Sequence, residues 1–110
     1  MIKWDDFECV ELRVGTIIEV LDFLEAKKPS YKLKIDFGDN IGIKKSSAQI
    51  TDLYKHEDLL GKQVIGVVNF QPKQIGPYIS ECLITGFVQN DGAVVLAVPD
   101  KQVKNGLKLA

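Results

Sequence analysis

YKLKIDFGDNIGIKKSS, residues 31–47, carries the clearest structural signal in the chain. Apolar side chains at 31, 33, 35 and 37 alternate with two lysines and an aspartate, a period of two that is typical of a half-buried β-strand. The tripeptide Gly38-Asp39-Asn40 favours a tight turn, and residues 41–47 then predict the returning strand. The lysines of this hairpin are expected to point outward.

Further strands are predicted on both sides of this hairpin. Residues 12–21 favour one long strand, in which Gly15 suggests a bend or bulge. Residues 63–70 contain a nearly continuous apolar run that is typical of a central strand, and residues 81–87 and 94–98 predict two shorter strands. Residues 72–77 contain two prolines and a glycine and favour an irregular loop.

Helical signals are few. Residues 5–9 are compatible with one helical turn, and residues 51–60 form the best helical segment. Thr51 is its expected N-cap, Leu53, Tyr54 and Leu60 are expected to face inward, and Gly61 is expected to end it. Five or more short strands with a helix between the third and fourth predict an all-β barrel of the OB-fold type, five-stranded with short N- and C-terminal extensions. Other small barrels and α+β sheets also fit the pattern.

The length and composition favour one domain over residues 1–110. The chain is 45% hydrophobic, which is ordinary for a globular protein. No apolar run reaches the roughly 18 residues of a membrane helix, and the first residues lack the apolar run of a signal peptide. The sequence therefore predicts a cytoplasmic protein without membrane insertion.

Charge is distributed unevenly. The net charge is −1, yet six lysines lie between residues 27 and 45 against two aspartates. This local excess of +4 leaves −5 for the rest of the chain. Two interpretations are open: the lysines form a solvated face that keeps the protein soluble, or they form a surface for a polyanion.

The chemistry of an enzyme is missing. His56 is the single histidine, so it would be the only base for a serine triad, and no nucleophile elbow or phosphate-binding glycine motif occurs. Cys9 and Cys82 have no partner at metal-ligand spacing and are expected to be reduced, buried thiols. We therefore expect no catalytic residue, no cofactor and no metal.

Five strings in order resemble the tRNA-binding domain family. RVGTI at 13–17, NFQPKQI at 69–75 and Ser80-Glu81 are similar to the opening, N-x-x-P and S-[EQ] elements of that family. IDFG at 35–38 and KKSSAQI at 44–50 resemble its CsaA branch. The spacing fits from about residue 6 to residue 106. The chain departs from the synthetase-linked branch at Cys82, where that branch has glycine, and at residues 76–78.

The resemblance implies a homodimeric OB-fold that acts as an export-related chaperone and binds the outer corner of tRNA. In an OB-fold, oligonucleotides usually lie on strands two and three, where four of the lysines fall. The tRNA contacts are therefore expected to be phosphate contacts without base readout. Asn69 and Ser80 can equally serve to tie down the 72–78 loop. The expected tRNA-binding residues are Arg13, Lys32, Lys34, Lys44, Lys45, Ser47, Asn69, Lys73, Ser80 and Glu81.

Apolar residues suggest two further surfaces. A groove for extended peptide is expected around the 72–78 loop, with walls formed by Phe70, Ile75, Tyr78, Ile79 and Phe87. Apolar residues near both chain ends suggest a two-fold dimer interface, and the expected set is Trp4, Phe7, Val103, Leu107 and Leu109.

The sequence thus predicts a non-enzymatic, homodimeric, CsaA-like binding protein. Its expected partners are tRNA, unfolded or pre-export polypeptides and export machinery. The alternative is a stand-alone tRNA-binding protein, or a synthetase-associated subunit, without a chaperone role.

Overall fold

A computed structural model describes all residues from Met1 to Ala110. Most of the chain is extended, and the two helices are short. In chain order the elements are α1 (Trp4–Glu8), β1 (Leu12–Asp22), β2 (Tyr31–Asp36), β3 (Ile43–Ala48), α2 (His56–Leu59), β4 (Gln63–Val67), β5 (Lys73–Ile75), β6 (Tyr78–Ser80), β7 (Leu83–Ile84), β8 (Gly86–Val88) and β9 (Val94–Leu96).

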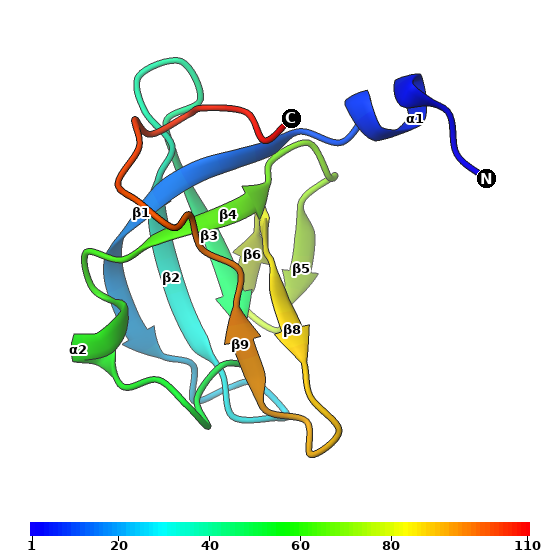
Figure 1. The fold of residues 1–110 in the computed structure, drawn as a ribbon. Helices are drawn as coiled ribbons and strands as arrows, with labels where there is room; N and C mark the ends of the chain where they lie inside the picture. The colour runs from blue at the N-terminus through cyan, green and yellow to red at the C-terminus, as the bar shows by residue number, and fades with distance from the viewer.

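Five strands form one curved antiparallel sheet in the order β3-β2-β1-β4-β7. β1 is long enough to serve both halves, because its first part pairs with β4 and its second part pairs with β2. The sheet bends on itself into a nearly closed barrel, with α2 between β3 and β4 (Figure 1). This arrangement confirms the predicted OB-fold.

The apolar alternation of β2 fills the barrel as expected. Leu33, Ile35 and Phe37 are buried in one core cluster. Gly15 on β1 lies directly over this cluster, and a Cβ atom there would stand 2.5 Å from Ile35 Cγ2 and 2.7 Å from the Phe37 ring. Glycine at this position therefore lets the β1 backbone approach the core more closely than any side chain permits.

The bulge expected at Gly15 lies three residues further on. The β1–β2 register shifts between Ile17 and Glu19, so that Ile18 has no opposite residue. Ile18 is exposed, whereas Ile17 is fully buried. The bulge reorients β1 at the point where it passes from β4 to β2.

The helix predicted for 51–60 is mostly wrong. Only His56–Leu59 is helical, and the N-cap is Lys55, whose backbone N–H donates to Asp58 Oδ2 at 2.8 Å. The carbonyl of Tyr54 accepts from the Tyr31 hydroxyl at 2.7 Å, so this part of the backbone is bonded to the barrel. The prediction that Leu53 and Leu60 face inward is also wrong, since Leu53 is 50% exposed and Leu60 59%.

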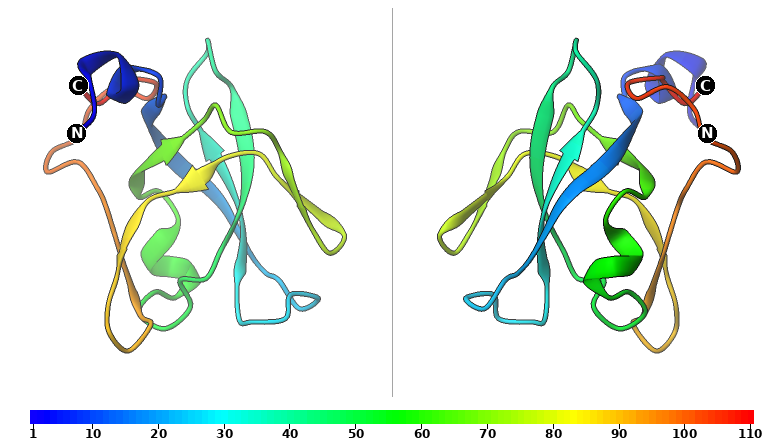
Figure 2. Two further views of the ribbon diagram at one scale, coloured as in Figure 1. Left: turned by 90° about the vertical axis from the view of Figure 1, so that its right-hand side faces the viewer. Right: turned by 90° about the vertical axis from the view of Figure 1, so that its left-hand side faces the viewer.

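The irregular loop predicted for 72–77 is instead a hairpin. β5 and β6 pair through Lys73↔Ser80 and Ile75↔Tyr78, with Gly76 at a positive φ of 56° in the turn. Figure 2 shows this hairpin projecting from the barrel on the same side as the 23–30 loop. The strand predicted for 81–87 is divided into β7 and β8, and β8 pairs with β9 in a separate sheet.

Both chain ends lie at the same end of the barrel (Figure 2). The C-terminal segment runs beside β1, where the carbonyl of Leu107 accepts from the Val14 N–H and the N–H of Leu109 donates to the Leu12 carbonyl. Residues 1–9, here called the N-terminal arm, project from the body, and α1 has no buried residue. Neither helix is long and apolar enough to cross a membrane.

Candidate nucleic-acid interface

The β2–β3 register places three lysines on one side of the sheet. Lys34 is opposite Lys45, and Lys32 is opposite Ser47. These four residues share the outward side and are here called the basic face. Lys44 is opposite the buried Ile35, so it points to the other side. The expected grouping of Lys44 with Lys45 is therefore wrong, since neighbouring residues of a strand face opposite ways.

Tyr78 lies over the basic face from the β5–β6 hairpin. Its ring centroid is 5.6 Å from Lys32 Nζ and 5.2 Å from Lys45 Nζ, and its hydroxyl donates to the Leu33 carbonyl at 3.2 Å. The ring also meets Phe23 edge-on at 5.6 Å. Burial and the nearby carboxylates raise the pKa of Tyr78 to about 12, so the hydroxyl stays neutral. The ring holds both ammonium groups by cation–π attraction.

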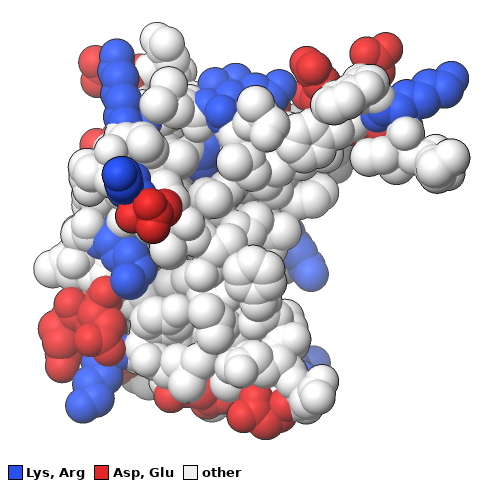
Figure 3. All heavy atoms as spheres, viewed as in Figure 1, with Lys and Arg blue, Asp and Glu red and all other residues white.

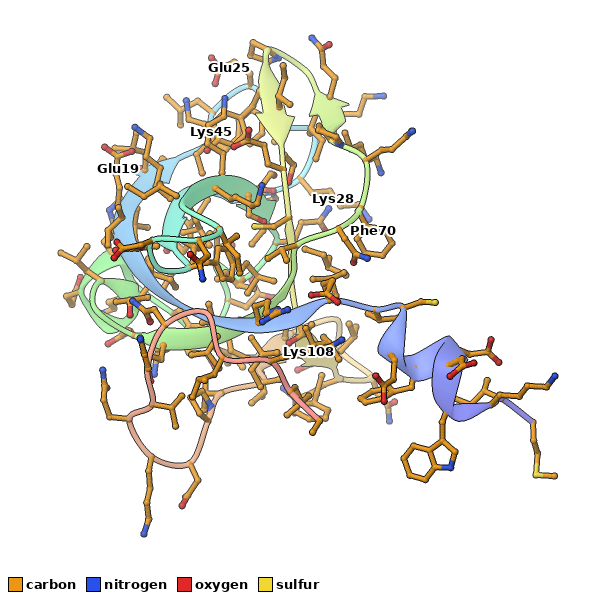
Figure 4. The ribbon with its side chains drawn as sticks, turned by 90° about the horizontal axis from the view of Figure 1, so that it is seen from above. Glu19, Glu25, Lys28, Lys45, Phe70 and Lys108 are labelled. Atoms are coloured by element: carbon orange, nitrogen blue, oxygen red, sulfur yellow. The ribbon has the colours of Figure 1, made fainter.

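The three lysines of the basic face differ in how far their charge is neutralised. Lys34 Nζ lies 3.4 Å from Glu19 Oε2, in an exposed pair across β1 and β2. Lys32 and Lys45 have no carboxylate oxygen within 4.0 Å. Figure 4 shows Lys45 and Glu19 on the same side of the barrel. Lys32 and Lys45 are therefore the cations of this face that remain available to a polyanion.

Ser80 and Glu81 close the barrel against the free edge of β3. The N–H of Glu81 donates to the Lys45 carbonyl at 2.7 Å, and the N–H of Lys45 donates to Glu81 Oε1 at 2.9 Å. Two residues on, the Ser47 N–H donates to Ser80 Oγ at 3.2 Å. Side chains thus take the place of a partner strand at this edge, and they fix the backbone that carries Lys45.

A pocket of about 400 Å³ opens next to this closure and is here called the side pocket. It shares Ser47 with the basic face. Figure 4 places Phe70 and Lys45 on opposite sides of the chain that leaves β6. The lining residues are Ser47, Phe70, Gln71, Lys73, Ile75, Ser80, Glu81, Cys82 and Leu83.

Cys82 is the buried thiol at the base of this pocket, whereas Cys9 is exposed in contrast to the expectation. Burial raises the pKa of Cys82 to about 12, although the charge of Lys44 and a hydrogen bond with Ser46 act in the opposite direction. A thiol with this pKa is almost entirely protonated at neutral pH and is a poor nucleophile.

The side-chain bonds of Arg13 and Asn69 are within the protein. The Arg13 guanidinium donates to Glu11 Oε1 and to the Gly106 carbonyl, both at 3.0 Å. Asn69 Oδ1 accepts from the Glu11 N–H, and its amide donates to the Cys9 carbonyl. Both side chains therefore fix the chain ends to the barrel, and Asn69 ties down residues 9–11 instead of the 72–78 loop.

Glu11 connects these contacts. Its carboxylate also accepts from Lys108 Nζ at 3.0 Å, so one acidic side chain joins β1 to the C-terminal segment. Hydrogen bonds from Arg13 and from Lys108 lower the pKa of Glu11 below its usual 4.5.

The five residues expected to form a peptide groove are separated in the structure. Phe70 and Ile75 line the side pocket. Tyr78 turns toward the basic face, and Ile79, its neighbour on β6, points the other way. Phe87 lies on β8 and is 67% exposed. A single groove with all five walls is therefore not formed.

The expected dimer residues are brought together only in part. Trp4, Phe7 and Leu109 line one hollow between the N-terminal arm and the C-terminus, and Trp4 is 84% exposed. Leu107 lines a different hollow, and the backbone of Val103 is bonded to Gln63. Figure 3 shows few charged atoms on the front surface over β8 and β9, beneath the arm.

The sequence interpretation missed several residues of these surfaces. Gln71 and Leu83 line the side pocket, and Val88 and Val95 add to the exposed apolar surface around Phe87. A hairpin reading of residues 73–80 would have placed Tyr78 and Ser80 on one side of β6, because they are two residues apart. No local sequence pattern predicts the contact of Tyr78 with the two lysines.

The isolated histidine lies away from these surfaces. His56 begins α2, its Nε2 is 2.8 Å from Asp22 Oδ1, and its ring meets Tyr31 edge-on at 5.0 Å. No group of three or more His, Cys, Asp or Glu residues is placed to hold a metal ion.

Comparison with solved structures gives full-length matches. The structure of CsaA chaperone protein from Picrophilus torridus is 55% identical, with a TM-score of 0.93 and 100% of both chains covered. The structure of chaperone CsaA from Bacillus anthracis is 44% identical, with a TM-score of 0.94, and covers 100% of this chain and 99% of that one. These matches confirm the predicted resemblance to the CsaA branch.

Curated relatives are much longer than this chain. The methionine–tRNA ligase of Pyrococcus abyssi is 39% identical over 109 residues, which are 98% of this chain and 14% of the ligase. That of Bacteroides fragilis is 34% identical over 105 residues, 96% of this chain and 15% of the ligase. The family model described as "Putative tRNA binding domain" matches residues 12–108. The chain therefore belongs to the tRNA-binding domain family.

Proposed function

We propose that this protein binds tRNA through phosphate contacts on the basic face, without catalysing a reaction. The observation that carries the proposal is the pair Lys32 and Lys45, two cations without carboxylate partners, held 5.6 Å and 5.2 Å from the centroid of the Tyr78 ring. Membership of the tRNA-binding domain family supports the same ligand. We further propose a cytoplasmic location, where tRNA is found.

The geometry favours recognition of the RNA backbone. The half-buried Tyr78 ring already contacts Phe23 and two lysines, so it is less open to a stacked base than a free ring. Lys27, Lys28 and Lys73 are exposed, and the 23–30 loop and the β5–β6 hairpin that carry them project on the same side of the barrel (Figure 2). Contacts to phosphate position a nucleic acid without reading its sequence, so we expect similar affinities for different tRNAs.

Salt dependence tests this proposal. Affinity for a mixture of purified tRNAs is measured by fluorescence anisotropy as the salt concentration rises. Four to six phosphate contacts predict a slope of log affinity against log salt between about −3 and −5. No binding in 50 mM salt, or binding that is independent of salt, would refute the proposal.

A second proposed activity is chaperone-like binding of unfolded or pre-export polypeptides. It is supported by the similarity to the CsaA chaperone structures and by the exposed apolar side chains elsewhere on the surface. Such binding should suppress aggregation of a denatured client and should respond weakly to salt, since apolar contacts are not screened. If salt abolishes client protection and tRNA binding together, both depend on the lysines and the apolar site is excluded.

We also propose a two-fold dimer. The exposed arm supplies Trp4 and Phe7, and the surface of β8 and β9 supplies the cross-strand pair Phe87 and Val95. Exposed apolar patches of this kind are typical of interfaces, and a stable contact should bury more than about 1,000 Å². Sedimentation that finds only monomer at micromolar concentration would contradict the dimer.

The alternative role is that of a stand-alone tRNA-binding protein or a synthetase-associated subunit. The similarity to one part of methionine–tRNA ligases favours it. A pull-down from lysate with and without ribonuclease separates the roles. Partners lost after ribonuclease treatment were held through RNA, whereas client polypeptides and a synthetase would remain and can be told apart by mass.

A further inference from the structure

The side pocket lies where RNA on the basic face would continue. Both surfaces include Ser47, and the Glu81 backbone is bonded to that of Lys45. A strand whose phosphates contact Lys32 and Lys45 would therefore bring an adjacent nucleotide to the mouth of the pocket. The chemistry of the pocket differs from that of the basic face in two respects.

First, the pocket has an open aromatic wall. The Phe70 side chain is 58% exposed, and Ile75 and Leu83 add apolar surface to the same lining. No other aromatic ring is packed against Phe70, since the ring pairs of the molecule involve other residues. An exposed ring beside aliphatic side chains is a stacking surface for a flat apolar face, and the bases of single-stranded nucleic acids stack on such rings.

Second, the pocket holds an unneutralised carboxylate. Glu81 Oε1 accepts the Lys45 N–H, and no cationic nitrogen lies within 4.0 Å of Glu81. Neither the Gln71 amide nor the Ser47 hydroxyl donates to or accepts from another protein group. Glu81 accepts hydrogen bonds here, and Lys73 in the same lining offers a cation to a phosphate, so the group that binds Glu81 donates a hydrogen bond and carries no negative charge.

We infer that the side pocket binds one unpaired nucleobase that carries an exocyclic amino group, stacked on Phe70 and donating to the Glu81 carboxylate. The inference rests on the proposed tRNA binding. Cytosine, adenine and guanine each offer an amino group, and carboxylates accept from such groups in base recognition. Uracil offers a single N–H between two carbonyl oxygens, which a carboxylate repels. The pocket thus adds a base preference to a surface that otherwise contacts phosphates.

A peptide side chain fits this lining less well. An apolar residue would contact Phe70 but would bury the Glu81 carboxylate without a partner, and an unpaired buried charge is strongly unfavourable. A lysine would pair with Glu81 but would leave most of the apolar wall uncovered. A base satisfies both groups with one planar ligand.

The test uses the full-length protein and five-nucleotide RNAs, UUUUU and the same strand with C, A or G at its centre. We expect about tenfold tighter binding of the three substituted strands than of UUUUU. Phe70→Leu should weaken binding of all four strands, and the control Leu53→Ala, an exposed apolar residue outside both surfaces, should not. Glu81→Gln can keep an oxygen on the Lys45 N–H while offering its NH₂ group to the base, so the preference should shift toward uracil.

Glu57→Gln, an exposed carboxylate on α2, is the matched control for charge, and circular dichroism verifies that each variant is folded. Equal affinity for all four strands, or a preference that Glu81→Gln leaves unchanged, would overturn the inference. So would loss of client-protein protection in Phe70→Leu with no change for RNA, which assigns the pocket to peptides. The salt slope for intact tRNA is measured separately, and its absence would refute the proposed function instead.

Discussion

The basic face and the N-terminal arm are built in opposite ways. Each charged group of the basic face is fixed by contacts within the chain: Lys34 by Glu19, Lys32 and Lys45 by Tyr78, and the Lys45 backbone by Glu81. The arm has a five-residue helix without a buried residue. A helix of that length is not stable alone in water. One surface is thus complete in a single chain, and the other exposes apolar side chains that the proposed dimer would cover.

The two surfaces are expected to bind their partners through different forces. Charges that are held in place but unpaired attract a flexible polyanion, and this attraction is screened by salt. Apolar side chains that are exposed on a projecting arm gain free energy by burial, which salt hardly affects. Substitutions in one surface should therefore leave binding at the other surface unchanged.

The largest effect is expected from Trp4→Ala. Trp4 is the largest exposed side chain of the arm, and buried tryptophans at the centre of an interface commonly contribute 2–4 kcal/mol. The dimer dissociation constant from sedimentation equilibrium should rise by roughly 30-fold or more. Leu24→Ala, an exposed side chain in the 23–30 loop, is the matched control. An unchanged dimer in Trp4→Ala would show that the arm is not the interface.

The next largest effect is expected from Gly15→Ala, in the barrel core beneath the basic face. In Gly15→Ala the new methyl group collides with Ile35 and Phe37, whose side chains lie under the basic face. Overpacking of this kind costs about 2 kcal/mol and should lower the Tm by roughly 10 °C. Thermal unfolding followed by circular dichroism measures it. A Tm equal to that of the wild type would mean that the close approach of β1 to the core is not required.

A smaller effect is expected from the contact of Glu11 that joins β1 to the C-terminal segment. The pKa of Glu11 is lowered in the folded protein, chiefly by its hydrogen bonds from Arg13 and Lys108. Because the folded pKa lies below the unfolded one, this contact stabilises fully above about pH 4.5 and is lost as the pH falls through the folded pKa. Glu11→Gln should therefore destabilise at neutral pH and lose less stability in acid than the wild type.

Urea unfolding between pH 3 and pH 7 measures this difference, with Glu57→Gln as the control for a carboxylate without an ion pair. If Glu11→Gln and the wild type lose stability in parallel as the pH falls, the carboxylate does not hold the C-terminal segment.

The sequence predicted the barrel because its strongest signals are local. The alternation at 31–37 and the apolar run at 64–68 fix which side chains face the core, and the structure confirms both. The sequence did not predict the β5–β6 hairpin, because each of its strands has three residues. Strands this short do not show a recognisable alternation of apolar and polar residues. The helix at 51–60 was overestimated because contacts of Tyr54 with Tyr31 and Leu96 override its propensity.

The candidate site was predicted less completely than the fold. Strand periodicity predicts that Lys32 and Lys34 share a face, but the sequence groups both Lys44 and Lys45 with them, and only the β2–β3 register shows that Lys45 alone belongs there. The structural roles of Arg13 and Asn69 depend on partners 93 and 58 residues away, which no local pattern contains. For the same reason the side pocket, assembled from segments around residues 47, 70 and 82, could not be recognised as one cavity.

The central claim is that Lys32 and Lys45 contact tRNA phosphates. The most direct measurement is the slope of log affinity against log salt for the double variant Lys32→Ala/Lys45→Ala, beside Lys101→Ala/Lys104→Ala, which removes the same charge from the C-terminal segment. Two lost phosphate contacts predict a slope shallower by about 1.4 to 1.8 in the first variant, an unchanged slope in the second, and the same loss of affinity for every tRNA. Equal slopes in the two variants would contradict the claim.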